Sequence, residues 1–345
     1  MNRTLTVAAV ASLVLVYDAT GELFLWSPSL IICVLYLIVS RDGREVLLDR
    51  VNLAVLGLMA LAVAINPSTD SKEIFRFIYV LGGVAFARRM REGCHEQLLF
   101  VLLFCLLTTE LGLRIAHGDF SEVAIYSMKA TGGVFADSNF TAVFVFAIIA
   151  SMIERRDLWR YLPAMMLLLL LTLSRTGWLM AGFYILARKF PKLGAVGIVV
   201  GLVFPVFLSG VLETSEADGS LLSKWYIYQT FIDVLRNRPA TLLLGVGRSA
   251  ATELAEEITG TTYSGHTLVG QTLQYGIVVM CGFYYVLCRY TREFVPRPYA
   301  FVATLLFGGV IGLAPSSYIG LLFVAATAVY HCHKTAMGEQ AVVPT

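Results

Sequence analysis

The sequence predicts an all-α, polytopic membrane protein with about twelve transmembrane helices and one large helical loop on the outer side. Its 345 residues are 57% hydrophobic and 14% charged, and the mean hydropathy is +0.74. Soluble domains carry about 25% charged residues, and long apolar stretches are typical of membrane spans. Short basic segments recur after every second apolar run. We therefore expect a single transmembrane domain over residues 1–345, and the net charge of +2 gives no indication of a nucleic-acid partner.

Apolar runs that could form these helices follow one another along the chain. A bilayer span needs ~17–25 residues, so several of the runs are short. They lie at about 5–17, 23–39, 51–66, 74–87, 97–113, 139–153, 158–174, 176–190, 193–211, 267–288, 298–314 and 316–331. With one crossing for each run, twelve helices are expected.

The basic segments predict the orientation of these helices. Short loops rich in Lys and Arg stay in the cytoplasm. Five segments carry three basic residues each: SRDGREVLLDR, RRMREGCHEQ, ERRDLWR, ARKFPK and RYTREFVPRP. Because an even number of runs separates them, all five are expected on the cytoplasmic side, together with both termini. The sequence thus predicts a multi-pass protein of the inner-membrane type.

Arg175 is the one formal charge between Tyr161 and Ala187. A guanidinium at the centre of a bilayer costs ~2.5–3.5 kcal/mol on insertion scales, so such a residue is a candidate for a functional site. The basic segments before and after this stretch are both expected inside. Residues 158–190 are therefore predicted to form a hairpin whose outer turn is Ser174-Arg175-Thr176-Gly177, with Arg175 recessed slightly below the outer surface.

The outer side is expected to carry a moderate loop, 114–138, and a large one, 212–266. The second is too long to be a simple connection. Within it, LLSKWYIYQTFIDVLRNRP has apolar residues close to a 3.6-residue period, which predicts an amphipathic helix that ends before Pro239. An apolar run, a glycine-containing turn, a short helix and the glycine-flanked His266 follow.

Arginines at the outer face suit one class of ligand. A lipid-linked diphosphate has its acyl chain in the bilayer and its phosphates at this depth, and planar guanidinium groups bind phosphate oxygens bidentately. Arg76 lies one turn inside a predicted span, where an ion pair with Glu73 is the alternative interpretation. The predicted outer segments contain no DxD carboxylate pair of the metal-binding type. We therefore expect side chains to stabilise the diphosphate charge, with no metal ion and no cofactor.

Four short motifs together resemble the superfamily of O-antigen ligases and Wzy-type polysaccharide polymerases. They are Asp137-Ser138-Asn139-Phe140-Thr141-Ala142, Ser174-Arg175-Thr176-Gly177-Trp178, LLLGVGRS at 242–249 and SGHTLVGQTLQYGIV at 264–278. Their order and expected placement match this superfamily over roughly residues 130–290.

The resemblance implies a metal-independent glycosyltransferase with a GT-C-like helical fold in the bacterial inner membrane, its active site facing the periplasm. It also implies that the donor glycan is carried on undecaprenyl diphosphate. His266 and Arg175 would be catalytic, and Arg175, Arg248 and Lys224 would bind the diphosphate, with weaker substrate contacts from Asn139 and Trp225. Arg76 lies outside these motifs and is a further candidate for the diphosphate because of its predicted position near the outer face. Two positions depart from the superfamily, because Lys224 stands where arginine is frequent and Thr267 where asparagine is common.

Three functions remain open at this point. A polymerase would use undecaprenyl-diphosphate-linked oligosaccharides as both donor and acceptor. Membrane lipids and a chain-length regulator are its further candidate partners. A ligase would instead use a lipid A core sugar as acceptor. A transporter of lipid-linked glycans is the third reading, although charges gathered at one face favour an enzyme. For His266 itself, a structural role as a helix cap is the alternative to catalysis.

Overall fold

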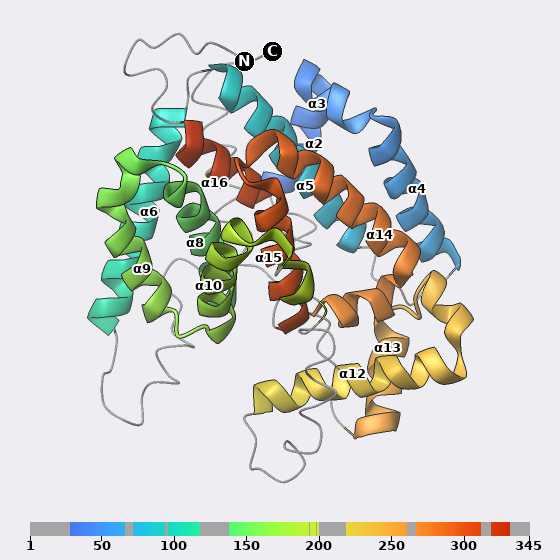
Figure 1. Cartoon of the computed structure of the whole chain (residues 1–345). Helices are drawn as coiled ribbons and strands as arrows, with labels where there is room; N and C mark the ends of the chain where they lie inside the picture. Colours follow the sequence, from blue (N-terminus) through green and yellow to red (C-terminus); the bar gives the residue numbers. More distant parts are fainter. Residues whose placement is uncertain are drawn as a thin grey trace.

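The structure is a computed structural model, and it describes residues 28–65, 72–93, 96–117, 138–192, 194–197, 199, 219–260, 267–311 and 319–331. Among these residues, every regular element is a helix (Figure 1). The elements are α2 (Pro28–Val39), α3 (Arg41–Leu47), α4 (Arg50–Ile65), α5 (Lys72–Gly93), α6 (Glu96–His117), α8 (Ser138–Ile153), η2 (Arg156–Tyr161), α9 (Leu162–Leu171), α10 (Arg175–Lys189), α12 (Gly219–Asn237), η3 (Pro239–Leu243), α13 (Arg248–Thr259), α14 (Leu268–Phe294), α15 (Pro298–Ile311) and α16 (Ile319–His331).

Helices α5, α8 and α16 form the centre of the main bundle. α16 packs against both α5 and α8, and α8 also packs against α9 and α10. Every residue of α8 from Ala142 to Ala150 is buried. A helix that is apolar all round is typical of the interior of a large bundle. The hydrophobicity of α8 is therefore explained by its contacts with other helices.

Helices α12 and α13 and the short η3 lie against the first half of α14, to one side of the main bundle (Figure 1). α12 contributes Trp225, Ile227 and Tyr228 to an apolar cluster that also contains Val269 of α14 and Val310 of α15. A second cluster consists of Val234, Leu242, Ala251 and Leu273. These clusters attach most of the described part of the 212–266 loop to α14.

The five basic segments of the sequence are joined to one another by polar contacts. Arg88 of α5 forms an ion pair with Glu293 at 2.8 Å, and Arg289 pairs with Asp49 at 2.6 Å. Glu154 pairs with Arg188 at 2.6 Å and with Arg297 at 3.7 Å. The Tyr299 hydroxyl donates to the Pro191 carbonyl at 2.8 Å. Segments that are distant in sequence, and that the positive-inside rule grouped together, are therefore neighbours in the fold.

The prediction of twelve transmembrane spans in a GT-C-like arrangement is wrong. In the described part of the chain, α14 is the single helix that is long and apolar enough to cross a membrane. The pair α3 and α4, bent by 57°, would add a second if both arms formed one span. The predicted multi-pass location in the inner membrane, with both termini in the cytoplasm and the active site facing the periplasm, is wrong for the same reason.

In the described part of the chain most of the apolar runs do form helices, and several of these helices are short or buried. α9 has 10 residues and α8 has 16, which correspond to lengths of about 15 and 24 Å at 1.5 Å per residue. The hydrocarbon core of a bilayer is about 30 Å thick. A short apolar helix enclosed by other helices has the same composition as a membrane span. Composition alone therefore did not distinguish buried helices from transmembrane helices.

Two local predictions can be compared with the structure. Within 158–190, η2 is followed by α9 and α10, and the break between these two helices lies at Thr172–Ser174, whereas the residues of the predicted turn at 174–177 form the cap and first turn of α10. The amphipathic stretch forms α12, which ends at Asn237, and the short helix after the glycine turn is α13. In contrast, α6 continues to His117, so the first residues of the predicted loop 114–138 are helical. The apolar run at 5–17 and most of the run at 193–211 lie outside the described residues.

Candidate functional site

The motifs at 137–142 and 174–178 meet where α8 and α10 begin. The Ser174 hydroxyl caps α10, because its Oγ accepts a hydrogen bond from the Gly177 N–H at 3.3 Å. The same hydroxyl donates to Asn139 Oδ1 of α8 at 2.9 Å. A Cβ at Gly177 would lie 2.6 Å from the Ala142 Cβ, so glycine allows the two helices to approach closely. Serine and glycine at these positions thus fix the first turn of α10 on α8.

Arg175 is the first residue of α10, and its side chain is exposed. The first N–H groups of a helix carry partial positive charge and favour anions. Trp178, one turn later, is held in place by a hydrogen bond from its indole Nε1 to the Leu169 carbonyl at 2.9 Å. The structure therefore places Arg175 at a capped helix start, and the predicted turn at 174–177 is the beginning of α10.

The exposed face of α10 continues from Arg175 with apolar side chains. Trp178, Leu179, Ile185 and Leu186 are all exposed, at positions three, four, ten and eleven residues after Arg175. These spacings place them on one face of the helix. Leu167 and Leu170 of the neighbouring α9 are also exposed. The Arg175 guanidinium thus stands at one end of a strip of apolar surface, and the exposed Lys189 stands at the other end of α10.

A buried ion pair lies beside the start of α8. Arg114 Nε contacts Glu110 Oε1 at 2.6 Å, and the two side chains are 1% and 0% exposed. Arg114 Nη2 lies 3.5 Å from the Thr141 hydroxyl of α8. The loop predicted at 114–138 began at Arg114, so this pair was missed. The i, i+4 spacing of Glu110 and Arg114 on an extended α6 was the signal that could have found it.

The motifs at 242–249 and 264–278 also meet, at a break in α14. Gly276 has φ +85° within the helix, which interrupts the regular backbone hydrogen bonds. The Val246 N–H donates to the Leu273 carbonyl at 2.9 Å, and the Gly247 N–H donates to the Gln274 carbonyl at 3.0 Å. The loop therefore supplies donors to carbonyls at the break. We call this arrangement of residues 245–247 and 273–276 the glycine clasp.

Two glycines make the clasp possible. Gly245 has φ +79°, and a Cβ there would lie 2.3 Å from the Gln274 carbonyl oxygen. A Cβ at Gly276 would lie 2.5 Å from the Gly245 nitrogen. α13 begins at Arg248, directly after the clasp, and the first arm of α14 begins after Thr267, whose hydroxyl accepts from the Gly270 N–H at 3.0 Å. The clasp thereby ties the start of α13 to the first arm of α14.

The remaining predicted site residues are placed only in part. The backbones of Arg248, Lys224 and Arg76 belong to α13, α12 and α5, while their side chains lie outside the described part, as does all of His266. Trp225 of α12 is 8% exposed and belongs to the apolar cluster that joins α12 to α14, so its described contacts are those of a core residue. Asn139 contacts the Arg175 turn through Ser174.

In the described residues, no group of three or more His, Cys, Asp or Glu side chains could hold a metal ion. Comparison with protein-family models, with curated proteins and with solved structures gives no match for this chain. The geometry of the two motif pairs therefore provides the indications of function.

Proposed function

We propose that this protein is a glycosyltransferase that takes a glycan from undecaprenyl diphosphate, and that it joins such lipid-linked oligosaccharide units into a polymer. The observation that carries the proposal is the exposed face of α10. On this face a guanidinium at a capped helix start is followed by apolar side chains. A polyprenyl diphosphate has the matching chemistry, since its phosphates need cationic donors and its chain needs apolar surface.

In the proposed reaction, Arg175 binds the donor diphosphate and stabilises the charge that develops on it as it leaves. The N–H groups of the first turn of α10 add to this stabilisation. Asn139 and Ser174 hold the turn in position through their hydrogen bond. Arg248, Lys224 and Arg76 supply further positive charge to the diphosphate.

His266 is proposed as the general base. A neutral imidazole, with an ordinary pKa of ~6.5, accepts the proton of the acceptor hydroxyl as that oxygen attacks the anomeric carbon. The C–O bond to the diphosphate breaks on the opposite side, so the anomeric configuration is inverted. The bonding electrons leave with the diphosphate.

The test is a reaction of the purified protein with undecaprenyl-diphosphate-linked repeat units in the presence of a metal chelator. The expected products are oligomers of increasing length, observed by mass spectrometry, and Arg175→Ala should abolish them whereas Arg236→Ala should not. Arg236 is an exposed arginine of α12 and serves as the matched control. Transfer only to an added lipid A core acceptor would identify a ligase, and the absence of transfer to either acceptor would refute the proposal.

A further inference from the structure

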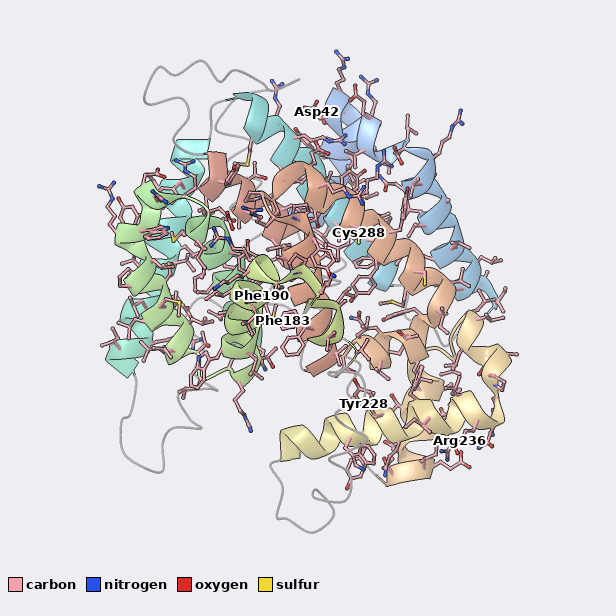
Figure 2. All side chains as sticks on the ribbon, in the orientation of Figure 1. Asp42, Phe183, Phe190, Tyr228, Arg236 and Cys288 are labelled. Atoms are coloured by element: carbon pink, nitrogen blue, oxygen red, sulfur yellow. The ribbon has the colours of Figure 1, made fainter. Side chains whose placement is uncertain are left out.

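A cavity of about 690 Å³ lies where α2 turns into α3, apart from the residues discussed above. Its lining consists of Tyr36, Val39, Ser40, Arg41, Asp42, Glu45 and Arg89. Figure 2 shows Asp42 at the opposite side of the molecule from Tyr228 and Arg236 of α12. Volumes of ~300–1,000 Å³ are typical of sites for small ligands. The cavity is thus large enough to hold a small polar group and is separate from α12.

The charges of the lining balance. Arg41 and Glu45 form an ion pair at 3.0 Å in which both side chains are exposed. Asp42 and Arg89 contribute one further charge of each sign. A ligand with a single net charge would gain from one of these two groups and be repelled by the other. A zwitterion, with an anionic and a cationic end, could contact both favourably.

An apolar strip leads along α2 to this cavity. Ile31, Ile32, Leu35, Ile38 and Val39 are exposed, and their spacing places them on one face of the helix. The opposite face of α2 is buried in the core through Cys33, Tyr36 and Leu37. Val39 belongs to both the strip and the cavity lining, so the two surfaces are continuous. An exposed apolar strip of this kind is a surface that an acyl chain can cover.

We propose that this surface binds a phosphatidylethanolamine molecule, with its headgroup in the cavity and an acyl chain along α2. The phosphodiester accepts hydrogen bonds from the Arg89 guanidinium, and the primary ammonium donates to the Asp42 carboxylate. The acyl chain covers the strip from Val39 towards Ile31. The site is independent of the proposed glycosyl transfer.

The test measures binding of short-chain phosphatidylethanolamine, phosphatidylcholine and phosphatidylglycerol to the purified full-length chain by native mass spectrometry. Phosphatidylethanolamine should bind about tenfold more tightly than the other two, because choline has no N–H to donate and glycerol has no positive charge. Free phosphoethanolamine should bind more weakly still, because it lacks the acyl chains. Equal affinity for the three lipids, or equal affinity for the free headgroup, would overturn the proposal.

Variants at the two charged residues complete the test. Asp42→Asn should remove the preference for phosphatidylethanolamine, and Arg89→Gln should weaken its binding about tenfold. Arg44→Gln is the matched control, because Arg44 is exposed on the same helix α3 and does not line the cavity. These side chains are on or near the surface, so the variants should fold. Unchanged lipid binding in both Asp42→Asn and Arg89→Gln would place the lipid elsewhere and refute the assignment.

Discussion

Gly245→Ala is the substitution that tests the glycine clasp most sharply. The added methyl group would lie 2.3 Å from the Gln274 carbonyl oxygen and 2.6 Å from the Gly276 nitrogen. Both neighbours are backbone atoms, so no side-chain rotation can relieve the overlap. The loop has to move away from α14, and the bonds from Val246 and Gly247 to the carbonyls of the break are then lost.

The expected cost has two parts. An alanine held at φ near +79° costs ~1–2 kcal/mol, and each lost backbone hydrogen bond contributes ~0.5–1.5 kcal/mol. With two bonds lost, the free energy of unfolding should fall by about 2–5 kcal/mol. Gly260→Ala is the matched control, since Gly260 has φ +67° and no atom within 4 Å of its Cβ position. Only the cost of about 1–2 kcal/mol for the positive φ applies there.

The assay is denaturant unfolding of the purified protein, followed by circular dichroism, for the wild type and both variants. Gly245→Ala should lower the free energy of unfolding by about 1–3 kcal/mol more than Gly260→Ala, because Gly245→Ala alone breaks the two hydrogen bonds. Equal losses in the two variants would show that the contact between residues 245–247 and the break in α14 contributes nothing to stability.

Three further predictions concern other groups. Glu110→Gln should lower the free energy of unfolding by about 3–5 kcal/mol, because it leaves the Arg114 charge buried without its carboxylate. The double variant Glu110→Met, Arg114→Leu should recover most of this loss, and an equal loss in both variants would contradict the prediction. Hydrogen bonds from Arg289 lower the pKa of the Asp49 carboxyl, so the stability that this pair adds should be present above pH ~4 and be lost as the pH falls further. Asp49→Asn should therefore differ from wild type in urea unfolding at pH 7 and converge with it in acid, and a constant difference at all pH values would rule out this linkage. His266→Ala should reduce turnover about 10²–10⁴-fold while the dissociation constant of the donor stays unchanged, and weakened donor binding with normal turnover would make His266 a binding residue.

Much of the helical architecture could be predicted from apolar runs alone. The run at 139–153 corresponds to α8 (Ser138–Ile153), and the run at 51–66 to α4 (Arg50–Ile65). The surroundings of these helices could not be predicted in this way. α8 is enclosed by protein, whereas α2 exposes one apolar face. The hydropathy of a segment indicates that its side chains are excluded from water, but it does not distinguish contact with protein from contact with lipid.

The motifs that the sequence analysis selected contact one another in two pairs. The motifs around Asn139 and Ser174 are joined by a hydrogen bond, and those around Gly245 and Gly276 by backbone contact. Their pairing depends on tertiary packing, so it could not be read from the motifs themselves. The partner of Arg114 was missed because the end of α6 was predicted one turn too early. Helix ends are the least certain feature of a hydropathy pattern, since polar residues there fit either a loop or a capped turn.

The binding of undecaprenyl diphosphate to Arg175→Lys tests the central claim most directly. Lysine keeps the positive charge at the start of α10 but loses the planar group that bonds two phosphate oxygens at once. The dissociation constant, measured by isothermal titration in detergent, should rise about tenfold or more in Arg175→Lys. It should stay unchanged in Arg236→Lys, which makes the same exchange on the exposed surface of α12 (Figure 2). Equal affinity in the wild type and in Arg175→Lys would contradict the proposal that this guanidinium binds the donor diphosphate.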